Sequence, residues 1–232
     1  MDTTDCIAQL EPLSRGALRH HVVRSLLKAI INGELLAGTR LITSRLAVRL
    51  GVSATPIREA LVQLELSGIV ELLHHHGAVV KPFGRKEVRD FYSVRGLLEC
   101  EAVRLACGHV RPELLQWLHS DLDRVIGESD NDRDRLVQDI TAVDRRIHRM
   151  ALEHCNNKRL IAEIARYSTL GEMLRDIVEL DVAQHLKVML PQADLLEAMQ
   201  QQQAESGAAA MGRHISLVAA TIETVMFDEN RN

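Results

Sequence analysis

The chain has 232 residues and a formal net charge of −4; 46% of the residues are hydrophobic and only 3% aromatic. No apolar run approaches the roughly 18 residues of a membrane span, and the N-terminus lacks the apolar segment of a signal peptide, so we expect neither a membrane protein nor a secreted one. The four cysteines show no CxxC pairing and are typical of reduced thiols in a cytoplasmic protein.

The charge is divided unevenly along the chain. Residues 12–85 hold 10 Lys and Arg against 4 Asp and Glu, whereas residues 86–232 hold 18 against 25. Because the N-terminal part is basic and the C-terminal part is acidic, the attraction for phosphate groups is concentrated in the N-terminal part, which favours nucleic-acid binding there. Unrelated two-domain proteins can share this asymmetry.

The first 85 residues predict helices followed by a small β-hairpin. Helical apolar spacing predicts three helices, at residues 17–32, 43–50 and 53–67. Two β-like runs follow, at residues 69–73 and 78–80. Gly51 should end the second helix and Ser53 should cap the third. This order is typical of a winged helix-turn-helix, so residues 12–83 are predicted to form a DNA-binding domain.

From residue 86 onward the only periodicity is helical. The apolar spacing predicts six helices, at residues 86–108, 111–127, 132–155, 157–179 (or as far as 189), 191–203 and 205–227. Pro191 and the pair 206–207 are assigned as breaks between the last three. Short connections between helices predict an antiparallel bundle over residues 86–227, and a mainly α fold class for the chain.

The third predicted helix carries the candidate DNA-reading residues. Arg58 turns outward near its N-terminal end, where a guanidinium can bind a guanine through two hydrogen bonds or clamp a phosphate. The further candidates are Arg45, Ser53 and Thr55 for phosphate contacts, and His76 with Gly77 for the minor groove. The alternative is an ordinary helical hairpin in which Arg58 pairs with a nearby carboxylate. The three histidines 74–76 indicate a solvated loop tip more than a metal site.

Residues 15–82 closely resemble the GntR family of bacterial transcription regulators. The matching segments are Gly38-Thr39-Arg40-Leu41, Leu50-Gly51-Val52-Ser53 and Thr55-Pro56-Ile57-Arg58-Glu59-Ala60-Leu61. Members of the family often carry Arg at the positions of Ser44 and Ala54. These two departures predict an operator that differs from those of the relatives, or a lower affinity.

Residues 87–222 resemble the all-helical FCD effector domain of the FadR subgroup of that family. The matching segments are 88–95, 98–99, 102–106, 144–148, 195–198 and residue 214. Metal-binding members use an Asp, a His four residues later and two later His residues, which align here with Asp144, His148, Gln192 and His214. Gln192 replaces one expected His and is a poor ligand for transition metals.

Asp144 and His148 lie four residues apart and therefore on one helix face. His214 lies on an apolar stripe and should point inward. Three such ligands would suit Zn²⁺, Ni²⁺ or Mn²⁺. The alternative is a metal-free pocket in which Asp144 and His148 hydrogen-bond to each other.

Arg95 lies on the apolar stripe formed by Phe91, Leu98, Ala102 and Leu105, where an unpaired charge would cost several kcal/mol. One interpretation is an internal salt bridge with Glu99 or Asp144. The other, which the resemblance implies, is a clamp for a carboxylate effector. Tyr92 and Gln192 complete the predicted effector site.

Our first hypothesis is a ligand-responsive transcription regulator, a repressor that binds a palindromic operator as a homodimer and senses a small carboxylate metabolite. The second is a metal-dependent enzyme that uses Asp144, His148 and His214. The sequence has no nucleophile motif, no HExxH and no Gly-rich phosphate loop, which counts against an enzyme. An architectural DNA-binding protein without a ligand is the third, and it would not need these inward-facing polar residues.

Overall fold

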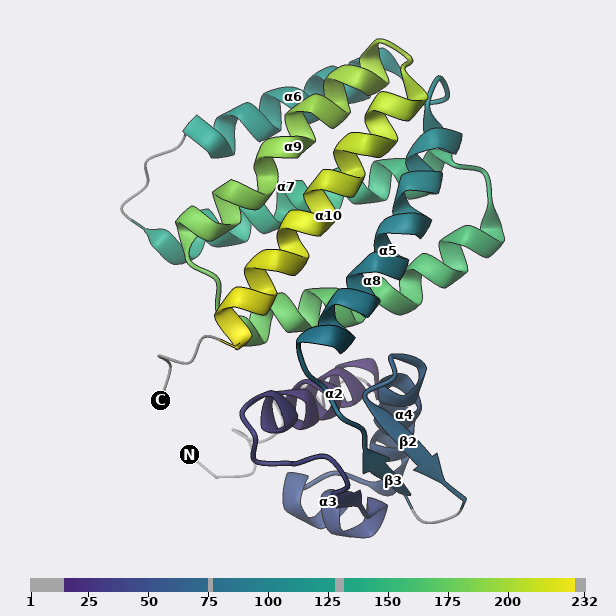
Figure 1. Ribbon diagram of the computed structural model, residues 1–232, viewed down its shortest axis with the longest axis vertical. Coiled ribbons are helices and arrows are strands. Elements are labelled where there is room, and N and C mark those ends of the chain that lie inside the picture. The colour runs from purple at the N-terminus through teal and green to yellow at the C-terminus, as the bar shows by residue number, and fades with distance from the viewer. Residues whose placement is uncertain (1–14, 75–76, 128–131, 228–232) are drawn as a thin grey trace, which may run out of the picture. The chain divides into compact units, whose positions relative to one another are not determined.

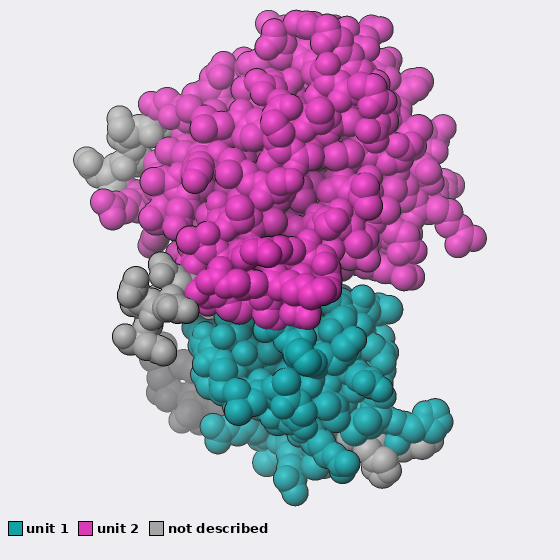
Figure 2. Space-filling view, viewed as in Figure 1, with its two compact units in different colours: residues 1–83 teal, residues 84–232 magenta. Residues whose placement is uncertain are grey.

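The computed structural model describes residues 15–74, 77–127 and 132–227, and the chain separates into two compact units, residues 1–83 and 84–232 (Figure 2). The first unit contains α2 (Arg15–Ile31), β1 (Arg40–Leu41), α3 (Thr43–Leu50), α4 (Ala54–Leu66), β2 (Val70–Leu73) and β3 (Gly77–Val80). The predicted three helices and hairpin are all present. The sequence did not predict β1, which is two residues long.

The three strands form one antiparallel sheet in the order β1-β3-β2. Leu41 of β1 pairs with Ala78 of β3, next to Gly77. Gly77 has φ +89°, and a Cβ at this position would lie 2.0 Å from the carbonyl oxygen of Leu41. Only glycine can therefore occupy the start of β3 without displacing β1.

Helices α2 and α4 form the core of the first unit through side chains that are all buried: Val22, Val23, Leu26, Leu27, Ile57, Ala60, Leu61 and Leu64. Helix α3 has no fully buried residue and ends at Gly51, whose φ of 65° allows the left-handed cap that the sequence predicted. The core therefore fixes α4, whose other face is exposed.

The second unit is a bundle of α5 (Arg85–Ala106), α6 (Pro112–Gly127), α7 (Arg133–His154), α8 (Lys158–Val178), α9 (Val182–Gln200) and α10 (Ala204–Met226) (Figure 1). Helix α10 packs between α5 and α9, while α7 contacts α5, α6 and α9. The fold class predicted from the sequence, mainly α with an N-terminal winged helix-turn-helix, is confirmed. None of the helices in the described ranges is long and apolar enough to cross a membrane.

The predicted break at Pro191 is wrong, because α9 continues through this proline. A proline inside a helix removes one backbone hydrogen bond. Buried side chains on both sides of it, Val188 and Met189 before and Leu195 and Leu196 after, hold the helix against the bundle. The break lies earlier, where Glu179 adopts φ +54°.

The predicted break at Ser206-Gly207 is also wrong, since both residues lie in the first turn of α10. The turn before this helix is made by Gln202, which has φ +56°. A Cβ on Gly207 would lie 3.2 Å from Cγ1 of Val103, so this glycine allows α10 to approach α5 closely. Its role is in helix packing, which local sequence cannot distinguish from a break.

Candidate functional site

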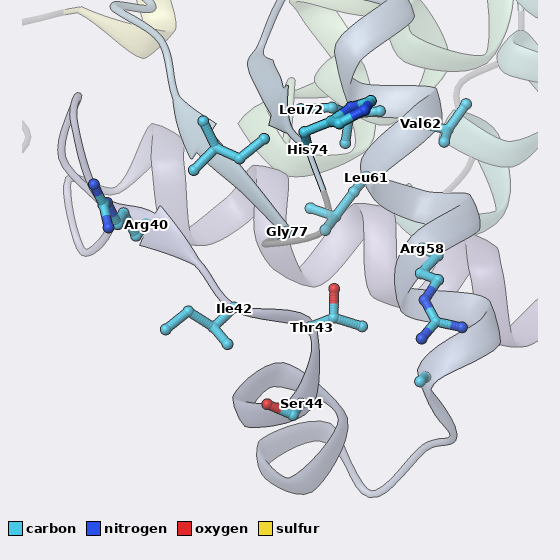
Figure 3. Close-up of a pocket in the computed structure, with 12 residues that line it drawn as sticks. Arg40, Ile42, Thr43, Ser44, Arg58, Leu61, Val62, Leu72, His74 and Gly77 are labelled. Atoms are coloured by element: carbon cyan, nitrogen blue, oxygen red, sulfur yellow. The ribbon is translucent and has the colours of Figure 1, made fainter.

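A groove of about 1000 Å³ lies in the first unit between α4 and the β2–β3 wing (Figure 3). Its polar and small lining residues come from three elements: Thr43 and Ser44 of α3, Ala54 and Arg58 of α4, and His74 and Gly77 of the wing. Arg40 lines the same groove from β1. A winged helix-turn-helix places the second helix of its helix-turn-helix, here α4, in the major groove of DNA with its exposed side facing the bases.

The guanidinium of Arg58 points into this groove (Figure 3). Within the described ranges it forms no hydrogen bond and no ion pair, so the alternative in which Arg58 neutralises a neighbouring carboxylate does not hold. An exposed cation that has no partner among the described residues is available to a phosphate or a guanine.

The other predicted DNA contacts lie around the same surface. Arg45, Ser53 and Thr55 are exposed. Ser53 occupies the N-cap position of α4 as predicted, but its side chain makes no capping hydrogen bond. Gly77 lines the groove, whereas His76 falls outside the described residues.

Four further residues of the groove were not predicted from the sequence as DNA contacts: Arg40, Thr43, Ser44 and His74. Arg40 belongs to the segment that resembles the family, and that was the one signal for it.

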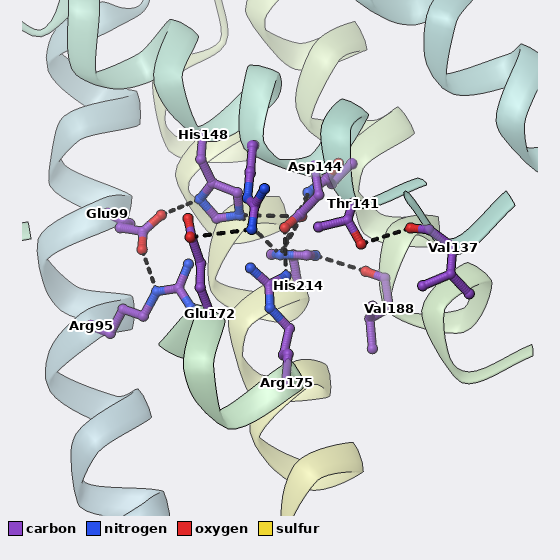
Figure 4. Close-up of polar contacts among 12 residues, drawn as sticks. Arg95, Glu99, Val137, Thr141, Asp144, His148, Glu172, Arg175, Val188 and His214 are labelled. Atoms are coloured by element: carbon purple, nitrogen blue, oxygen red, sulfur yellow. Dashed lines mark hydrogen bonds and ion pairs between the residues drawn. The ribbon is translucent and has the colours of Figure 1, made fainter. Parts of the chain in front are cut away.

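The second unit contains a buried polar centre built from α5, α7, α8, α9 and α10 (Figure 4). Nε2 of His148 lies 3.1 Å from Nε2 of His214, and Oδ1 of Asp144 lies 3.4 Å and 3.3 Å from these two atoms. Asp144 and His214 are 2% and 1% exposed. The structure therefore brings together all three residues that the sequence predicted as metal ligands.

Each histidine is oriented through its other ring nitrogen. Nδ1 of His148 contacts the carboxylate of Glu99, and Nδ1 of His214 donates to the carbonyl oxygen of Val188 at 2.7 Å. Burial would lower the pKa of His148, but the carboxylates of Glu99 and Asp144 outweigh it and raise the pKa to about 9. Burial lowers the pKa of His214 to about 4. Such partners fix which nitrogen of each ring faces the centre.

Two arginines neutralise the two buried carboxylates. Nε of Arg95 donates to Oε1 of Glu99 at 2.5 Å, which is the internal salt bridge considered from the sequence. Nη1 of Arg175 donates to Oδ2 of Asp144 at 2.5 Å. Burial acts to raise the pKa of each carboxyl, but the adjacent arginine and His148 outweigh it, so both pKa values are lowered.

Arg175 was not among the site residues predicted from the sequence. The available signal was the one that identified Arg95: a charged residue among the buried side chains Leu174, Ile177 and Val178. Leu105 was wrongly placed on the buried stripe of α5, because its side chain is 37% exposed. Phe91 and Ala102 are buried as predicted, and Val103 and Ala106 extend the buried stripe.

Tyr92 and Gln192 border the polar centre, and each has a buried oxygen without a partner among the described residues. The ring of Tyr92 lies 5.8 Å from the guanidinium carbon of Arg95. Nε2 of Gln192 donates to Oδ1 of Asp144 at 2.6 Å. These are the buried polar atoms that a ligand could satisfy.

Two family descriptions match this chain. Residues 18–80 match "Bacterial regulatory proteins, gntR family", and residues 90–217, more than half of the chain, match "FCD domain". The chain belongs to the GntR family. It is a DNA-binding transcription regulator with an FCD effector domain, and its relatives are regulators rather than enzymes.

This GntR regulator is similar in sequence to three curated relatives. The HTH-type regulator Rv0043c of Mycobacterium tuberculosis is 36% identical over 43% of this chain and 41% of its own length. The regulator McbR of Escherichia coli is 30% identical over 57% of this chain and 58% of its own length. The repressor RspR of E. coli is 22% identical over 94% of this chain and 93% of its own length. The first two alignments span less than two thirds of those relatives.

The solved structure of E. coli McbR shares the fold of this GntR regulator. It covers 91% of this chain and 98% of its own, with a TM-score of 0.57 and 23% sequence identity.

The donor atoms of Asp144, His148 and His214 fit a divalent metal ion. Ligand atoms that bind one ion at about 2.0–2.1 Å lie roughly 3.0–3.4 Å apart, and these three lie 3.1–3.4 Å apart. Both Nε2 atoms face the centre because their Nδ1 atoms are engaged elsewhere. The amide nitrogen of Gln192 also reaches these donors, at 2.6 Å from Oδ1 of Asp144 and 3.5 Å from Nε2 of His214.

Proposed function

We propose that the protein is a ligand-responsive repressor that binds a palindromic operator as a homodimer and senses a small carboxylate through its FCD domain. The carrying observation is the groove beside α4, into which the guanidinium of Arg58 projects without a partner among the residues that the structure describes. The E. coli relative RspR is named a transcriptional repressor, which supports the sign of the regulation.

The operator contact rests on the surface around Arg58. Thr43 and Ser44 begin α3 and Ser53 precedes α4, so hydroxyls and free backbone N–H groups lie at two helix starts. Helix starts bind phosphates, while Arg58 can reach a base edge. A dimer with two such DNA-binding domains reads two half-sites about one turn of DNA apart. Because the two domains are related by two-fold symmetry, we propose that the operator is a palindrome.

The effector site rests on the polar centre of the FCD domain. Asp144, His148 and His214 would hold a Zn²⁺, Ni²⁺ or Mn²⁺ ion, which supplies positive charge for binding an anion. Arg95 is linked to this centre through Glu99, which contacts His148, and the Tyr92 ring lies beside Arg95. Arg95 and the Tyr92 hydroxyl, which has no partner among the described residues, would orient a carboxylate. Gln192 would contribute its unpartnered carbonyl oxygen.

The effector would act by differential affinity for two arrangements of the protein. Glu99 and Arg95 both belong to α5, the helix that begins at Arg85, directly after the first unit. Any change in the contact between His148 and Glu99 is therefore applied to the helix that leads to the DNA-binding unit.

The test is sequencing of genomic DNA fragments that the purified protein retains at physiological salt. A few promoters sharing a palindrome would support a specific regulator, and small carboxylates added to the bound fragments should then release them. Retention of DNA without sequence preference would contradict the proposed operator. Analytical ultracentrifugation of the protein with one palindrome should give two chains per duplex.

A further inference from the structure

Helix α4 presents two apolar residues and one cation on a single face. Ala54, Arg58 and Val62 are spaced by four residues and all line the groove beside the wing. Figure 3 shows Arg58 and Val62 on α4. Ala54 precedes Arg58 by one helical turn, and Val62 follows it by one. The face that would enter the major groove therefore carries one cation with an apolar side chain one turn before it and another one turn after it.

The two apolar residues of this face, Ala54 and Val62, do not pack into the core of the unit but are at least partly exposed to solvent. Val62 is 45% exposed and Ala54 is partly exposed. Neither side chain can donate or accept a hydrogen bond. On the major-groove edges of the four base pairs, the apolar group is the 5-methyl of thymine, and alanine and other methyl-bearing side chains contact it.

We propose that Ala54 and Val62 read thymines on either side of the base that Arg58 contacts, each through the thymine 5-methyl group. The inference rests on the proposed operator binding and names the bases that the helix selects. Ala54 is then a specificity residue in its own right, although it provides no hydrogen bond. The half-site should contain a base bound by Arg58 with thymines within one or two base pairs of it.

The experiment uses the full-length protein and the palindrome that it selects from random duplexes. Each thymine of a half-site is replaced in turn by uracil, which lacks the 5-methyl group but keeps every hydrogen-bonding atom. Loss of one buried methyl contact should weaken binding about fourfold at each contacted thymine. Fluorescence anisotropy of the labelled duplex gives the ratio of the two dissociation constants.

Variants assign each methyl contact to a residue. In Ala54→Gly the uracil effect should disappear at one thymine, and in Val62→Ala it should disappear at the other. Val48→Ala is the matched control, since Val48 is 85% exposed on helix α3 and does not line the groove, and its uracil profile should equal that of the wild type. The ratio is taken within each variant, so a general loss of helix stability cancels.

Ala54→Arg provides a second, independent measurement. A guanidinium at this position should change the selected base from thymine to guanine, because arginine binds O6 and N7 of guanine. Continued selection of thymine by this variant would overturn the role of Ala54.

The outcomes separate this inference from the proposed function. Selection of a palindrome whose thymines all tolerate uracil would overturn the methyl contacts and leave the operator intact. A uracil effect that persists unchanged in Ala54→Gly and Val62→Ala would also overturn the assignment. Failure to select any sequence would overturn the proposed operator and the inference together.

Discussion

Nε2 of His148 lies 3.1 Å from Nε2 of His214, although 66 residues separate them in the chain. Glu99 engages Nδ1 of the first ring, and the carbonyl of Val188 accepts from Nδ1 of the second. Both rings therefore present the same type of nitrogen to the point that Oδ1 of Asp144 also faces. The proposed metal ion of the FCD domain rests on this convergence of three donor atoms.

His148→Ala should lower the affinity for Zn²⁺, Ni²⁺ or Mn²⁺ by at least about tenfold and weaken the response to the effector, because one of three donors is removed. Binding of operator DNA without effector should be unchanged, because His148 is not part of the first unit. Mass spectrometry measures the metal content, and a gel shift assay measures operator binding. His109→Ala, an exposed histidine, is the control; a His148 variant that equals it in both measurements would remove the site.

Gln192→His should tighten metal binding, because an imidazole is a stronger ligand for these ions than an amide oxygen. Gln192 is completely buried and its amide already contacts Asp144, so the new ring would lie next to the three donors. Isothermal titration with Zn²⁺ compares the two proteins. Equal affinities would show that residue 192 does not face the ion.

Arg58→Ala should weaken operator binding by about 1–3 kcal/mol and relax the base preference at one position of the half-site. Arg49→Ala is the matched control, since it removes an exposed arginine from the neighbouring helix α3 outside the groove. Its effect should be small and equal for all sequences. The same loss in both variants would mean that Arg58 acts only through its charge.

Asp144→Asn should lower the free energy of unfolding of the metal-free protein by about 3–5 kcal/mol, because Arg175 would remain buried without its carboxylate. Adding Arg175→Met should recover part of this loss, since the unpaired charge is then also removed. Denaturant unfolding of the wild type, both single variants and the double variant gives the coupling energy. Strictly additive losses would show that the ion pair is not the source of the effect.

Glu223 should make the stability of the FCD domain depend on pH in acid. The hydrogen bond from Arg89 lowers the pKa of Glu223, burial opposes this, and Arg85 assists it. A carboxyl group whose pKa is lower in the folded state contributes stability above its unfolded value, near 4.5, and loses it as the pH falls through the folded value.

Comparison of the wild type with Glu223→Gln by denaturant unfolding checks this linkage. The difference in stability between them should be largest at pH 7 and shrink as the pH falls below 4.5. A difference that is constant with pH would exclude the linkage.

Local patterns in the sequence determined the elements of the DNA-binding unit and the positions of its exposed residues. The spacing of Ile57, Ala60, Leu61 and Leu64 specifies which face of α4 is buried, and so which face carries Arg58. Gly51 ends α3 by adopting the left-handed conformation, and this conformation depends only on the residue itself, so it can be predicted from the sequence. Relationships within one or two helical turns follow from the geometry of the helix itself.

Tertiary structure decided what depends on packing between distant segments. The pairing of Arg175 with Asp144 and the role of Gly207 require the approach of helices that no local spacing encodes. Pro191 and Ser206-Gly207 have the local chemistry of breaks, yet the helices continue because burial of their apolar faces outweighs one lost hydrogen bond or a flexible residue. The helical spacing in the sequence placed Arg95 and His214 on inward faces, although it misplaced Leu105 and left out Arg175. The packing of five helices decided which of the inward residues meet.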